Sequence, residues 1–503
     1  MGCRFAGAQD LQAYWEMITD GRDGFGPVPA DRWDAEAFFD ANPRATDKSY
    51  APAGGFIDDV RSFPAIALQI PPRRVEVMDP QQRLGLEICL AAVEDAGYSA
   101  DTMPTQTGVY MGVTAMEYRT LIGARLSAQM MATGAFGEAP EDPSTLADIA
   151  NRVLPSRPFT APGGLSNMIA ATVAQELRIK GPAYTVDAAC ASALVALADA
   201  VAALRTGQVD CALAGGVYIC LTPEHHVAFS RVGAMSRQGQ CLPFDARADG
   251  FVEGDGCGVI MLKRVEDAVA AGDRIYGVIA GVGMNNDGGG EGPMAPVKSG
   301  QIDVIDRAWR DAGIPRSQLG YVEAHGTGTS VGDKIEFEGL LSAFGAEAEE
   351  VTLGSSKANV GHTMSAAGIA GVIRATLAMH HRIRPPMANF ESPKEDLRIA
   401  DTPFHIPKEA RPWGKEERVA AVSSFGFGGT NVHVVLSSEE ALPEPAEVPE
   451  LVLMSAPDER TLKDLARRSA RALAEDPTAT VAGVSRAWSI RRIQSARLGV
   501  VAR

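Results

Sequence analysis

The stretch YTVDAACASALVALADAV, residues 184–201, places a cysteine where a strand-like run gives way to an alanine-rich one. β-Branched and aromatic residues before Asp187 favour a strand, whereas the alanines and leucines after it favour a helix. The alanine-rich run is apolar on nearly every side, which is typical of a helix buried among other elements. The stretch therefore predicts a buried strand, a tight turn that holds Cys190, and a helix.

A second stretch repeats this pattern. Residues 351–379, VTLGSSKANVGHTMSAAGIAGVIRATLAM, again run from a strand through a tight turn to a helix rich in alanine and glycine. Such small residues let other helices or strands approach closely. Up to about Leu436, short apolar runs alternate with helical runs, which is the pattern of a layered α/β fold. Two related halves would explain the repetition.

Composition excludes several classes of protein. The 503 residues are 46% hydrophobic, enough to bury one or two large cores, and the formal net charge is -16. An acidic chain disfavours nucleic acid and anionic membranes as partners, because both attract a basic surface. Neither a signal peptide nor a membrane-spanning run is recognised, so we expect a cytoplasmic protein. The seven cysteines form no CxxC pair and no Cys/His metal spacing, so we expect reduced thiols and no metal site.

The composition changes after the last strand-like run of the main domain. Residues 437–450, SSEEALPEPAEVPE, hold three prolines and five glutamates and can bury very little. After them, LVLMSA and RLGVVA predict strands on either side of a helix with leucines at helical spacing. We therefore expect a main domain at 1–440, a linker at 441–450 and a small α/β unit at 451–503, with further domains after it.

Cys190 is the candidate nucleophile. A helix N-terminus carries unpaired N–H groups and a partial positive charge, and both favour the thiolate, which is the nucleophilic form. The flanking alanines leave room for a substrate. The alternative is a cysteine that only packs, which suits Cys211 and Cys220 better because both lie inside strand-like runs.

Two of the eight histidines lie in turns suited to a ligand. His325, in VEAHGTGTSVGD, and His362, in SSKANVGHTMSAAG, each begin a turn rich in small residues after an apolar strand, where glycines let the backbone approach a ligand. A polar turn histidine without a ligand is the alternative for both. The other six lie in ordinary contexts: His225, His226, His380, His381, His405 and His433.

Charged residues accompany both histidines. Lys357 precedes His362 by five residues. Asp333 and Glu336 follow His325 by eight and eleven residues. A buried lysine requires a carboxylate partner, so these groups could orient the histidines; exposed salt bridges are the alternative.

A glycine-rich turn, SSFGFGGTN at residues 423–431, joins two strand-like runs. It lacks the Gly-Lys-Ser/Thr ending of a phosphate-binding loop, which disfavours a nucleotide ligand. Its phenylalanines suit either a mobile apolar gate or plain core, and its backbone N–H groups suit an oxyanion.

Four motifs together identify a family. DAACASAL, VEAHGTGTSVGD, SSKANVGHTMSAAG and SFGFGGTN, in this order and at this spacing, resemble the signature of β-ketoacyl synthases, in particular ketosynthase domains of type I polyketide synthases. The resemblance covers almost the whole chain, and residues 451–503 are similar to the linker between ketosynthase and acyltransferase domains. It implies a thiolase-like α/β fold of two similar βαβ halves in five layers, which would account for the repeated pattern.

The resemblance implies an acyltransferase that performs a decarboxylative Claisen condensation. Cys190 would hold an acyl chain as a thioester, while His325 and His362 would hold the carbonyl of a malonyl-type thioester as carbon dioxide leaves. The carbanion would attack the acyl group, with the oxyanion held by backbone N–H groups of Cys190 and Phe427. Phe427, next to Gly428, would also gate the acyl pocket. Two neutral imidazoles that donate hydrogen bonds suit this chemistry, so no metal is needed.

Supporting residues and partners follow from the same resemblance. Lys357 would be structural and electrostatic, with Asp333 or Glu336 as its partner. Substrate contacts would come from Thr327, Thr329, Asn359 and Phe425. The domain would need no cofactor of its own, because its substrates arrive on the phosphopantetheine of an acyl carrier protein, docked by a basic patch such as Arg73 and Arg74. A homodimer within a larger polyketide or polyunsaturated fatty acid synthase, with an acyltransferase nearby, is expected.

Three departures from the family pattern are visible. DAACA replaces the usual DTACS and, with APGGLSNMIA at 161–170, is more similar to polyunsaturated fatty acid and enediyne synthases, which favours an iterative enzyme. Residues 138–164 form a longer segment than usual, and we expect it to affect the pocket or dimer contacts. A strand of the type IAIVG normally precedes GCRF; without it we expect an open sheet edge and a fragment boundary at the start.

Other interpretations explain fewer residues. A non-elongating ketosynthase usually lacks the cysteine or a histidine, and all three are present. A degradative thiolase needs a second cysteine near the C-terminal glycine turn, where SFGFGGTNVH has none. A Cys-His hydrolase leaves the second histidine motif unexplained.

Overall fold

The computed structural model describes residues 1–503 except 136, 139–141, 154, 290–291, 293–294, 415–417, 439–449, 476–480, 482–483, 486–487, 489–492 and 503. The strands of its two main sheets are β1 (Gly2–Phe5), β2 (Thr107–Gly112), β3 (Ala183–Val186), β4 (Cys211–Tyr218), β5 (Gly256–Lys263), β6 (Val278–Asn286), β7 (Leu319–Glu323), β8 (Val351–Gly354), β10 (Phe404–His405), β12 (Val419–Phe425) and β13 (Thr430–Ser437). Within the described residues, the first sheet has the order β1-β5-β4-β2-β3 and the second β10-β8-β7-β12-β13-β6.

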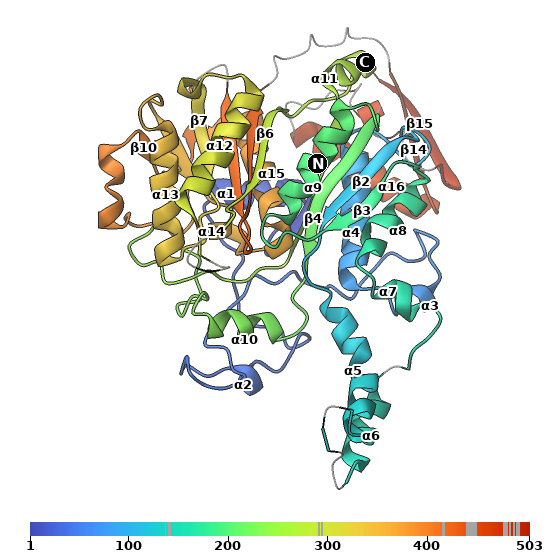
Figure 1. Cartoon of the computed structure of the whole chain (residues 1–503). Coiled ribbons are helices and arrows are strands. Elements are labelled where there is room, and N and C mark those ends of the chain that lie inside the picture. Colours follow the sequence, from blue (N-terminus) through green and yellow to red (C-terminus); the bar gives the residue numbers. More distant parts are fainter. Residues whose placement is uncertain are drawn as a thin grey trace.

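Helices lie between the two sheets and on their outer faces (Figure 1). The long helices are α1 (Leu11–Thr19), α4 (Pro80–Asp95), α8 (Asn167–Leu177), α9 (Ser192–Arg205), α12 (Lys298–Ala312), α13 (Ser330–Phe344) and α15 (Ala367–His381). Both α9 and α15 contact strands of both sheets, so they form the middle layer. Helices α4 and α8 cover the first sheet, and α12 and α13 pack with the second. These five layers confirm the predicted layered α/β fold.

The two predicted strand–turn–helix units are present. The first consists of β3, the turn at 187–191 and α9; the second consists of β8, the short helix α14 (Lys357–Val360) and α15. The alanine- and glycine-rich faces of α9 and α15 meet in one buried core, which explains why both helices are apolar nearly all round. The repeated sequence pattern thus corresponds to two similar halves that share a central layer.

Shorter elements complete the main domain. They are α2 (Ala35–Phe38), α3 (Pro72–Val75), α5 (Glu117–Ala132), α6 (Ser144–Arg152), α7 (Thr160–Gly163), α10 (Glu224–Arg231), α11 (Val265–Ala271), β9 (Ile383–Arg384) and β11 (Arg411–Pro412). Helices α5 and α6 pack together and project from the body at the bottom of Figure 1. The segment 138–164, which the sequence marks as unusually long, includes α6 and α7 of this region.

The C-terminal unit has the predicted strand, helix and strand. Strands β14 (Glu450–Ala456) and β15 (Ala496–Ala502) pair antiparallel, and α16 (Glu459–Glu475) packs against both. A small core that includes Val452, Met454 and Leu462 holds the unit together. All but the last residue of the predicted linker, 441–450, lies outside the described residues.

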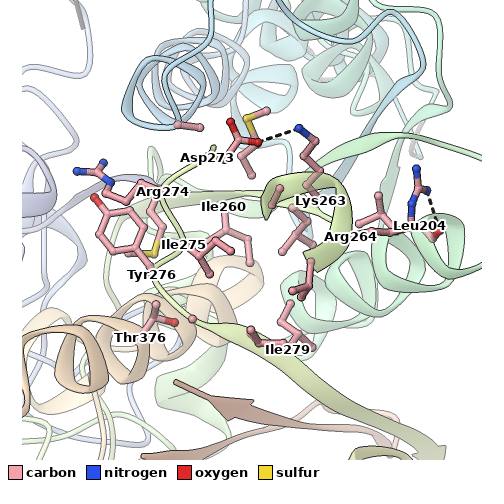
Figure 2. Close-up of a pocket in the computed structure, with 18 of the residues that line it drawn as sticks. Leu204, Ile260, Lys263, Arg264, Asp273, Arg274, Ile275, Tyr276, Ile279 and Thr376 are labelled. Atoms are coloured by element: carbon pink, nitrogen blue, oxygen red, sulfur yellow. Dashed lines mark hydrogen bonds and ion pairs between the residues drawn. The ribbon is translucent and has the colours of Figure 1, made fainter. Parts of the chain in front are cut away.

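Strand β1 lies at the edge of the first sheet. It pairs with β5 only from Gly2 opposite Val259 to Phe5 opposite Gly256. In the described part of the chain, no strand pairs with the rest of this edge of β5, and Ile260 and the residues after it border a cavity of about 460 Å³. Figure 2 shows this cavity, with the ion pair of Lys263 and Asp273 at its rim. The expected open sheet edge is thus present.

Across the described ranges, no helix combines the length and the apolar character needed to cross a lipid bilayer.

The close contact of the two central helices can be tested by one substitution. A Cβ atom on Gly368 of α15 would lie 2.5 Å from the Cγ atom of Leu194 in α9, so Gly368→Ala should lower the free energy of unfolding by about 1–3 kcal/mol. Gly123 of α5 is the matched control, since a Cβ atom there meets nothing within 4 Å, and Gly123→Ala should not destabilise. Urea unfolding followed by circular dichroism checks both. Equal stability of the two variants would contradict this packing.

Candidate active site

Cys190 lies in the tight turn between β3 and α9. Ala189, just before it, has φ +50, a left-handed conformation that is strained for a residue with a side chain. The Ser192 hydroxyl stabilises this turn, because it donates to the carbonyl of Ala189 at 2.6 Å and accepts from the N–H of Ala188 at 2.8 Å. The Cys190 carbonyl accepts a hydrogen bond from the Ser424 hydroxyl at 2.7 Å. The turn is therefore built to hold one side chain in a fixed direction.

The expected preference of Cys190 for the thiolate is not met. The helix begins at Ser192, two residues later, and Cys190 is only 6% exposed. Burial raises the pKa of the thiol to about 11, although the positive charge of Lys357 and the backbone N–H groups of Phe427 and Cys190 oppose this. Burial outweighs the field of the helix end, so the resting residue is a neutral thiol.

His325 lies two residues beyond the end of β7. Its backbone N–H and that of Gly326 donate to the two carboxylate oxygens of Glu336, both at 2.7 Å. Gly326 has φ +37, where a glycine is favoured. The carboxylate of Glu336 therefore fixes the backbone at His325 and leaves the imidazole directed into the site.

His362 follows Gly361, whose φ of +74 also requires the freedom of glycine. The His362 N–H donates to the carbonyl of Val252 at 2.6 Å, which ties this turn to the first half. The rings of His325 and His362 lie 5.7 Å apart at nearly a right angle. Both predicted histidines thus share one site.

The hydrogen bonds of the two imidazoles define their tautomer. His362 Nδ1 accepts from the N–H of Met364 at 3.1 Å, and His325 Nδ1 faces the N–H of Phe425 at 3.5 Å. In a neutral imidazole whose Nδ1 accepts, the proton is on Nε2. Burial, together with the positive charge of Lys357, holds the pKa of both histidines well below its usual range. Each ring therefore offers a neutral Nε2–H donor.

Lys357 is buried, and Glu336, one of its two predicted partners, acts on it through its charge without a direct ion pair. Its Nζ donates to the carbonyl of His325 at 2.5 Å, and among the described residues no carboxylate lies within ion-pair distance. Asp333 instead accepts from the N–H groups of Phe244 and Gly328 at 2.7 and 3.0 Å. Loop N–H groups thus occupy the carboxylates of Asp333 and Glu336, and the lysine donates to a backbone carbonyl. Burial lowers the pKa of Lys357, while the charge of Glu336 opposes this from a distance.

These side chains open into a single cavity of about 530 Å³. Its lining includes Cys190, His325 and His362 together with the predicted contacts Thr327, Thr329, Phe425 and Phe427. Phe427 is 40% exposed at the tip of the β12–β13 turn, where Gly428 and Gly429 have φ +94 and +83. The cavity of Figure 2 is lined by none of these residues, so the chemistry belongs to the larger one.

Asn359 is a correction to the predicted substrate contacts. It is fully buried; its amide donates to the carbonyl of Arg22 at 2.6 Å and accepts from Arg374 at 3.0 Å. With both amide atoms engaged, Asn359 is structural and does not line the cavity.

Ser424 and Phe251 contribute to the site but were not singled out from the sequence. Ser424 anchors the Cys190 turn, and the Phe251 ring packs edge-on against His362 at 5.1 Å. Ser424 lies inside the SSFGFGGTN motif, so the motif already indicated its region. No pattern in the sequence indicated the contact between Phe251 and His362.

Three family profiles match this chain over nearly its whole length. The family profile "Beta-ketoacyl synthase, N-terminal domain" matches residues 1–268, "Beta-ketoacyl synthase, C-terminal domain" matches 276–391, and "Ketoacyl-synthetase C-terminal extension" matches 393–495. A phenolphthiocerol/phthiocerol polyketide synthase of Mycobacterium tuberculosis is 40% identical over 451 residues, which is 89% of this chain and 28% of that protein. Polyketide synthase PksL of Bacillus subtilis is 37% identical over 452 residues, 88% of this chain and 9% of that protein.

Solved structures show the same likeness. The ketosynthase from module 6 of the bacillaene synthase of Bacillus subtilis 168 superposes with a TM-score of 0.85 at 32% identity, covering 100% of this chain and 81% of that one. The oxazolomycin ketosynthase domain OzmH KS7 of Streptomyces albus JA3453 superposes with a TM-score of 0.87 at 33% identity, covering 100% and 84%.

The raised pKa of Cys190 makes a prediction for alkylation. Only the thiolate reacts with iodoacetamide, so the rate at Cys190 should rise about tenfold for each pH unit from 7 to 10, without a plateau. Mass spectrometry of tryptic peptides over a series of pH values measures the rate. The Cys190→Ser variant identifies the peptide, and a plateau near pH 7 to 8 would show a thiolate at rest and contradict the burial argument.

Proposed function

The chain belongs to the β-ketoacyl synthase family, and on this premise we propose how its own residues perform the reaction. Ketosynthase domains of polyketide synthases are acyltransferases that catalyse a Claisen condensation. The observation that carries the proposal is one shared cavity, in which the Cys190 thiol lies with the imidazoles of His325 and His362. The remaining steps follow from the donors that surround each atom.

The first step is transfer of the acyl chain to Cys190. The Cys190 sulfur forms a bond to the acyl carbon, the bond from that carbon to the incoming phosphopantetheine sulfur breaks, and the thiol proton passes to the leaving sulfur. Because the resting thiol has a pKa of about 11, its deprotonation is coupled to binding of the acyl thioester. The carrier protein leaves with a free thiol.

The second step is loss of carbon dioxide from a malonyl-type thioester. As the bond to the carboxylate breaks, its electron pair moves onto the thioester carbonyl oxygen, where negative charge develops. In this proposal the Nε2–H donors of His325 and His362 hydrogen-bond this oxygen without giving up a proton, which is supported by the Nδ1 contacts of both rings. Water exclusion by the buried site strengthens both bonds.

The third step is attack of the carbanion on the acyl group held by Cys190. A carbon–carbon bond forms, and the former carbonyl oxygen becomes an oxyanion. The backbone N–H groups of Cys190 and Phe427, which lower the pKa of the thiol, are the proposed donors for this oxyanion. The bond from carbon to the Cys190 sulfur then breaks, so the β-ketoacyl chain leaves on the carrier protein.

The turn at 426–429 is the proposed gate of the acyl pocket. Phe427 is partly exposed, and the positive φ angles of Gly428 and Gly429 give the turn conformations that other residues rarely adopt. Its ring lies 6.2 Å from that of Phe229 in α10. Movement of this turn would open a path between the cavity and α10.

The neighbouring domains are also proposed. The chain spans about a quarter of the mycobacterial relative, so we place it within a larger synthase that supplies an acyltransferase and an acyl carrier protein with its phosphopantetheine. We divide the chain into a ketosynthase domain (1–440), a linker (441–450) and a linker subdomain (451–503), supported by the separate small core of the last part. Arg73 is exposed and Arg74 partly exposed on α3, as a docking patch for an acidic carrier requires.

The proposals for the product class and for the cellular compartment rest mainly on the sequence. DAACA supports an iterative enzyme that makes a polyunsaturated or long chain. All seven cysteines are free thiols in the described structure, which supports a reducing compartment, the cytoplasm.

A homodimer is supported by two surfaces. Strand β3 forms an edge of the first sheet, where a second copy can pair with it. The projecting α5 exposes apolar side chains that include Leu126 and Met130. Exposed apolar surface of this kind marks an interaction site.

Mass spectrometry of the intact protein tests the mechanism. Incubation with acyl thioesters should add one acyl group to the wild type and to Cys211→Ala, a buried cysteine control, but none to Cys190→Ala. Addition of malonyl-carrier protein should then remove the acyl group with release of carbon dioxide, and His362→Ala should slow this release by about 10²–10³-fold because one donor to the developing charge is lost. An adduct that never elongates would instead support a non-elongating, acyl-holding domain; no adduct in folded protein would contradict the role of Cys190.

The dimer has its own test. The double variant Leu126→Glu, Met130→Glu places two charges on the apolar face of α5 and should convert a dimeric wild type to monomer in light scattering after size exclusion. Ile66→Glu is the control, because Ile66 is 90% exposed and is not part of α5. A monomeric wild type, or a double variant that stays dimeric, would contradict this surface.

A further inference from the structure

A second cluster of reactive side chains lies outside the candidate active site. Cys220 follows β4 by two residues, His226 is in α10, and Glu253 lies in the segment between Phe251 and β5. All three are buried, with exposed fractions of 1%, 2% and 1%. One sulfur, one imidazole nitrogen and one carboxylate oxygen lie within 4.8 Å of one another. None of the three residues lines the cavity of the candidate active site.

Two atoms of this cluster are buried without a hydrogen bond. They are Nε2 of His226 and Oε2 of Glu253, which face each other at 3.3 Å without hydrogen-bond geometry. Buried polar atoms in native proteins almost always have a partner, and an ion or a water is a common explanation for those that lack one. The Cys220 sulfur lies within 4.8 Å of a ligand atom of each of the other two residues, and its thiol donates to the carbonyl of Thr222 at 3.4 Å.

The separation of these two atoms fits a tetrahedral metal ion. With a zinc–nitrogen distance of about 2.0–2.1 Å and a zinc–oxygen distance of about 2.0–2.2 Å, two ligands of a tetrahedral site lie roughly 3.3–3.5 Å apart. The observed distance of 3.3 Å between Nε2 of His226 and Oε2 of Glu253 agrees with this range. To become the third ligand, the Cys220 thiol would give up its hydrogen bond to the Thr222 carbonyl.

The surroundings orient two of the ligands. The other oxygen of Glu253 accepts a hydrogen bond from the Tyr218 hydroxyl, which in turn lies 2.6 Å from Nδ1 of His225. The Phe56 ring stacks on His226 at 6.1 Å. Such outer contacts fix a carboxylate and an imidazole in the direction that a metal requires.

One member of the cluster borders a cavity. His226 lines a cavity of about 230 Å³ whose wall also includes Trp33, Pro223 and the exposed Phe39, while Cys220 and Glu253 do not line it. An ion that reached the cluster from this cavity would meet the imidazole first.

We propose that Cys220, His226 and Glu253 bind one Zn²⁺ ion. A thiolate, an imidazole and a carboxylate are ligands that zinc takes, and the imidazole and the carboxylate already have tetrahedral spacing, whereas magnesium or calcium would select oxygen ligands alone. The ion would join the end of β4 to α10 and to the segment at 251–255. Phe251 contacts His362, and Phe229 of α10 contacts Phe427, so the ion would brace the wall behind the histidine and the gate.

Metal analysis of the whole chain tests the site. After growth with added zinc and dialysis against metal-free buffer, the wild type should retain about one zinc per chain by plasma mass spectrometry. Cys220→Ala and His226→Ala should each lose it, and Glu253→Gln, which keeps the shape of the side chain, should bind more weakly. Cys211→Ala is the matched control, since Cys211 is a fully buried cysteine of β4 away from the cluster. Circular dichroism confirms that each variant is folded.

Cobalt binding gives a spectroscopic test that can be made on the wild type itself. Co²⁺ added to the zinc-free chain should produce a thiolate-to-cobalt charge-transfer band, present in Cys211→Ala and absent in Cys220→Ala. A wild type that binds neither zinc nor cobalt would overturn the proposal and leave a direct contact of His226 with Glu253. Metal that stays bound in both Cys220→Ala and His226→Ala would overturn it as well.

Discussion

The buried ammonium of Lys357, hydrogen-bonded to the carbonyl of His325, is the interaction on which the site depends. Its charge lies close enough to both imidazoles to disfavour their protonation, in addition to the effect of burial. The same charge partly offsets the burial of the Cys190 thiol. One cation held by a backbone carbonyl thus keeps two histidines as neutral donors and a cysteine within reach of its nucleophilic form. A protonated imidazole would also bind an enolate, but it would lose its proton to the carbanion.

The fold brings the reacting groups together from both halves of the chain. Cys190 comes from the turn before α9, and His362 comes from the turn before α15; these two helices form the central layer. His325 lies at the end of β7, and the β12–β13 turn closes over the thiol. A Cβ atom on Gly426 would lie 2.4 Å from the carbonyl of Ala188, so only glycine allows this turn to approach the cysteine. Close packing of small residues is therefore a requirement of the chemistry as well as of the core.

The sequence predicted the turns of the site well because each lies within one short motif. Strand, turn and helix around Cys190 follow from local composition, and so do the glycines beside His325 and His362. The sequence could not predict contacts between segments that lie far apart in the chain. Lys357 donates to a backbone carbonyl, and no sequence pattern predicts such a partner. Asn359 is polar and lies within a motif, which suggested a substrate contact, but its side chain accepts a hydrogen bond from Arg374. The helix-end argument for Cys190 was local, whereas burial by the whole fold decides its pKa. Cys220, His226 and Glu253 match no metal-binding spacing, since the chain brings them together only after β4 and β5 pair.

The central claim is that His325 and His362 are neutral Nε2–H donors throughout the working pH range. The most direct test is an NMR titration of the protein labelled with ¹⁵N in the histidine rings, with His325→Gln and His362→Gln to assign the two signals. The account expects both rings to show a protonated Nε2 and an unprotonated Nδ1, unchanged from pH 8 to below pH 6. Titration of either ring with a pKa near or above the ordinary value of about 6.5, or a proton on Nδ1, would contradict it.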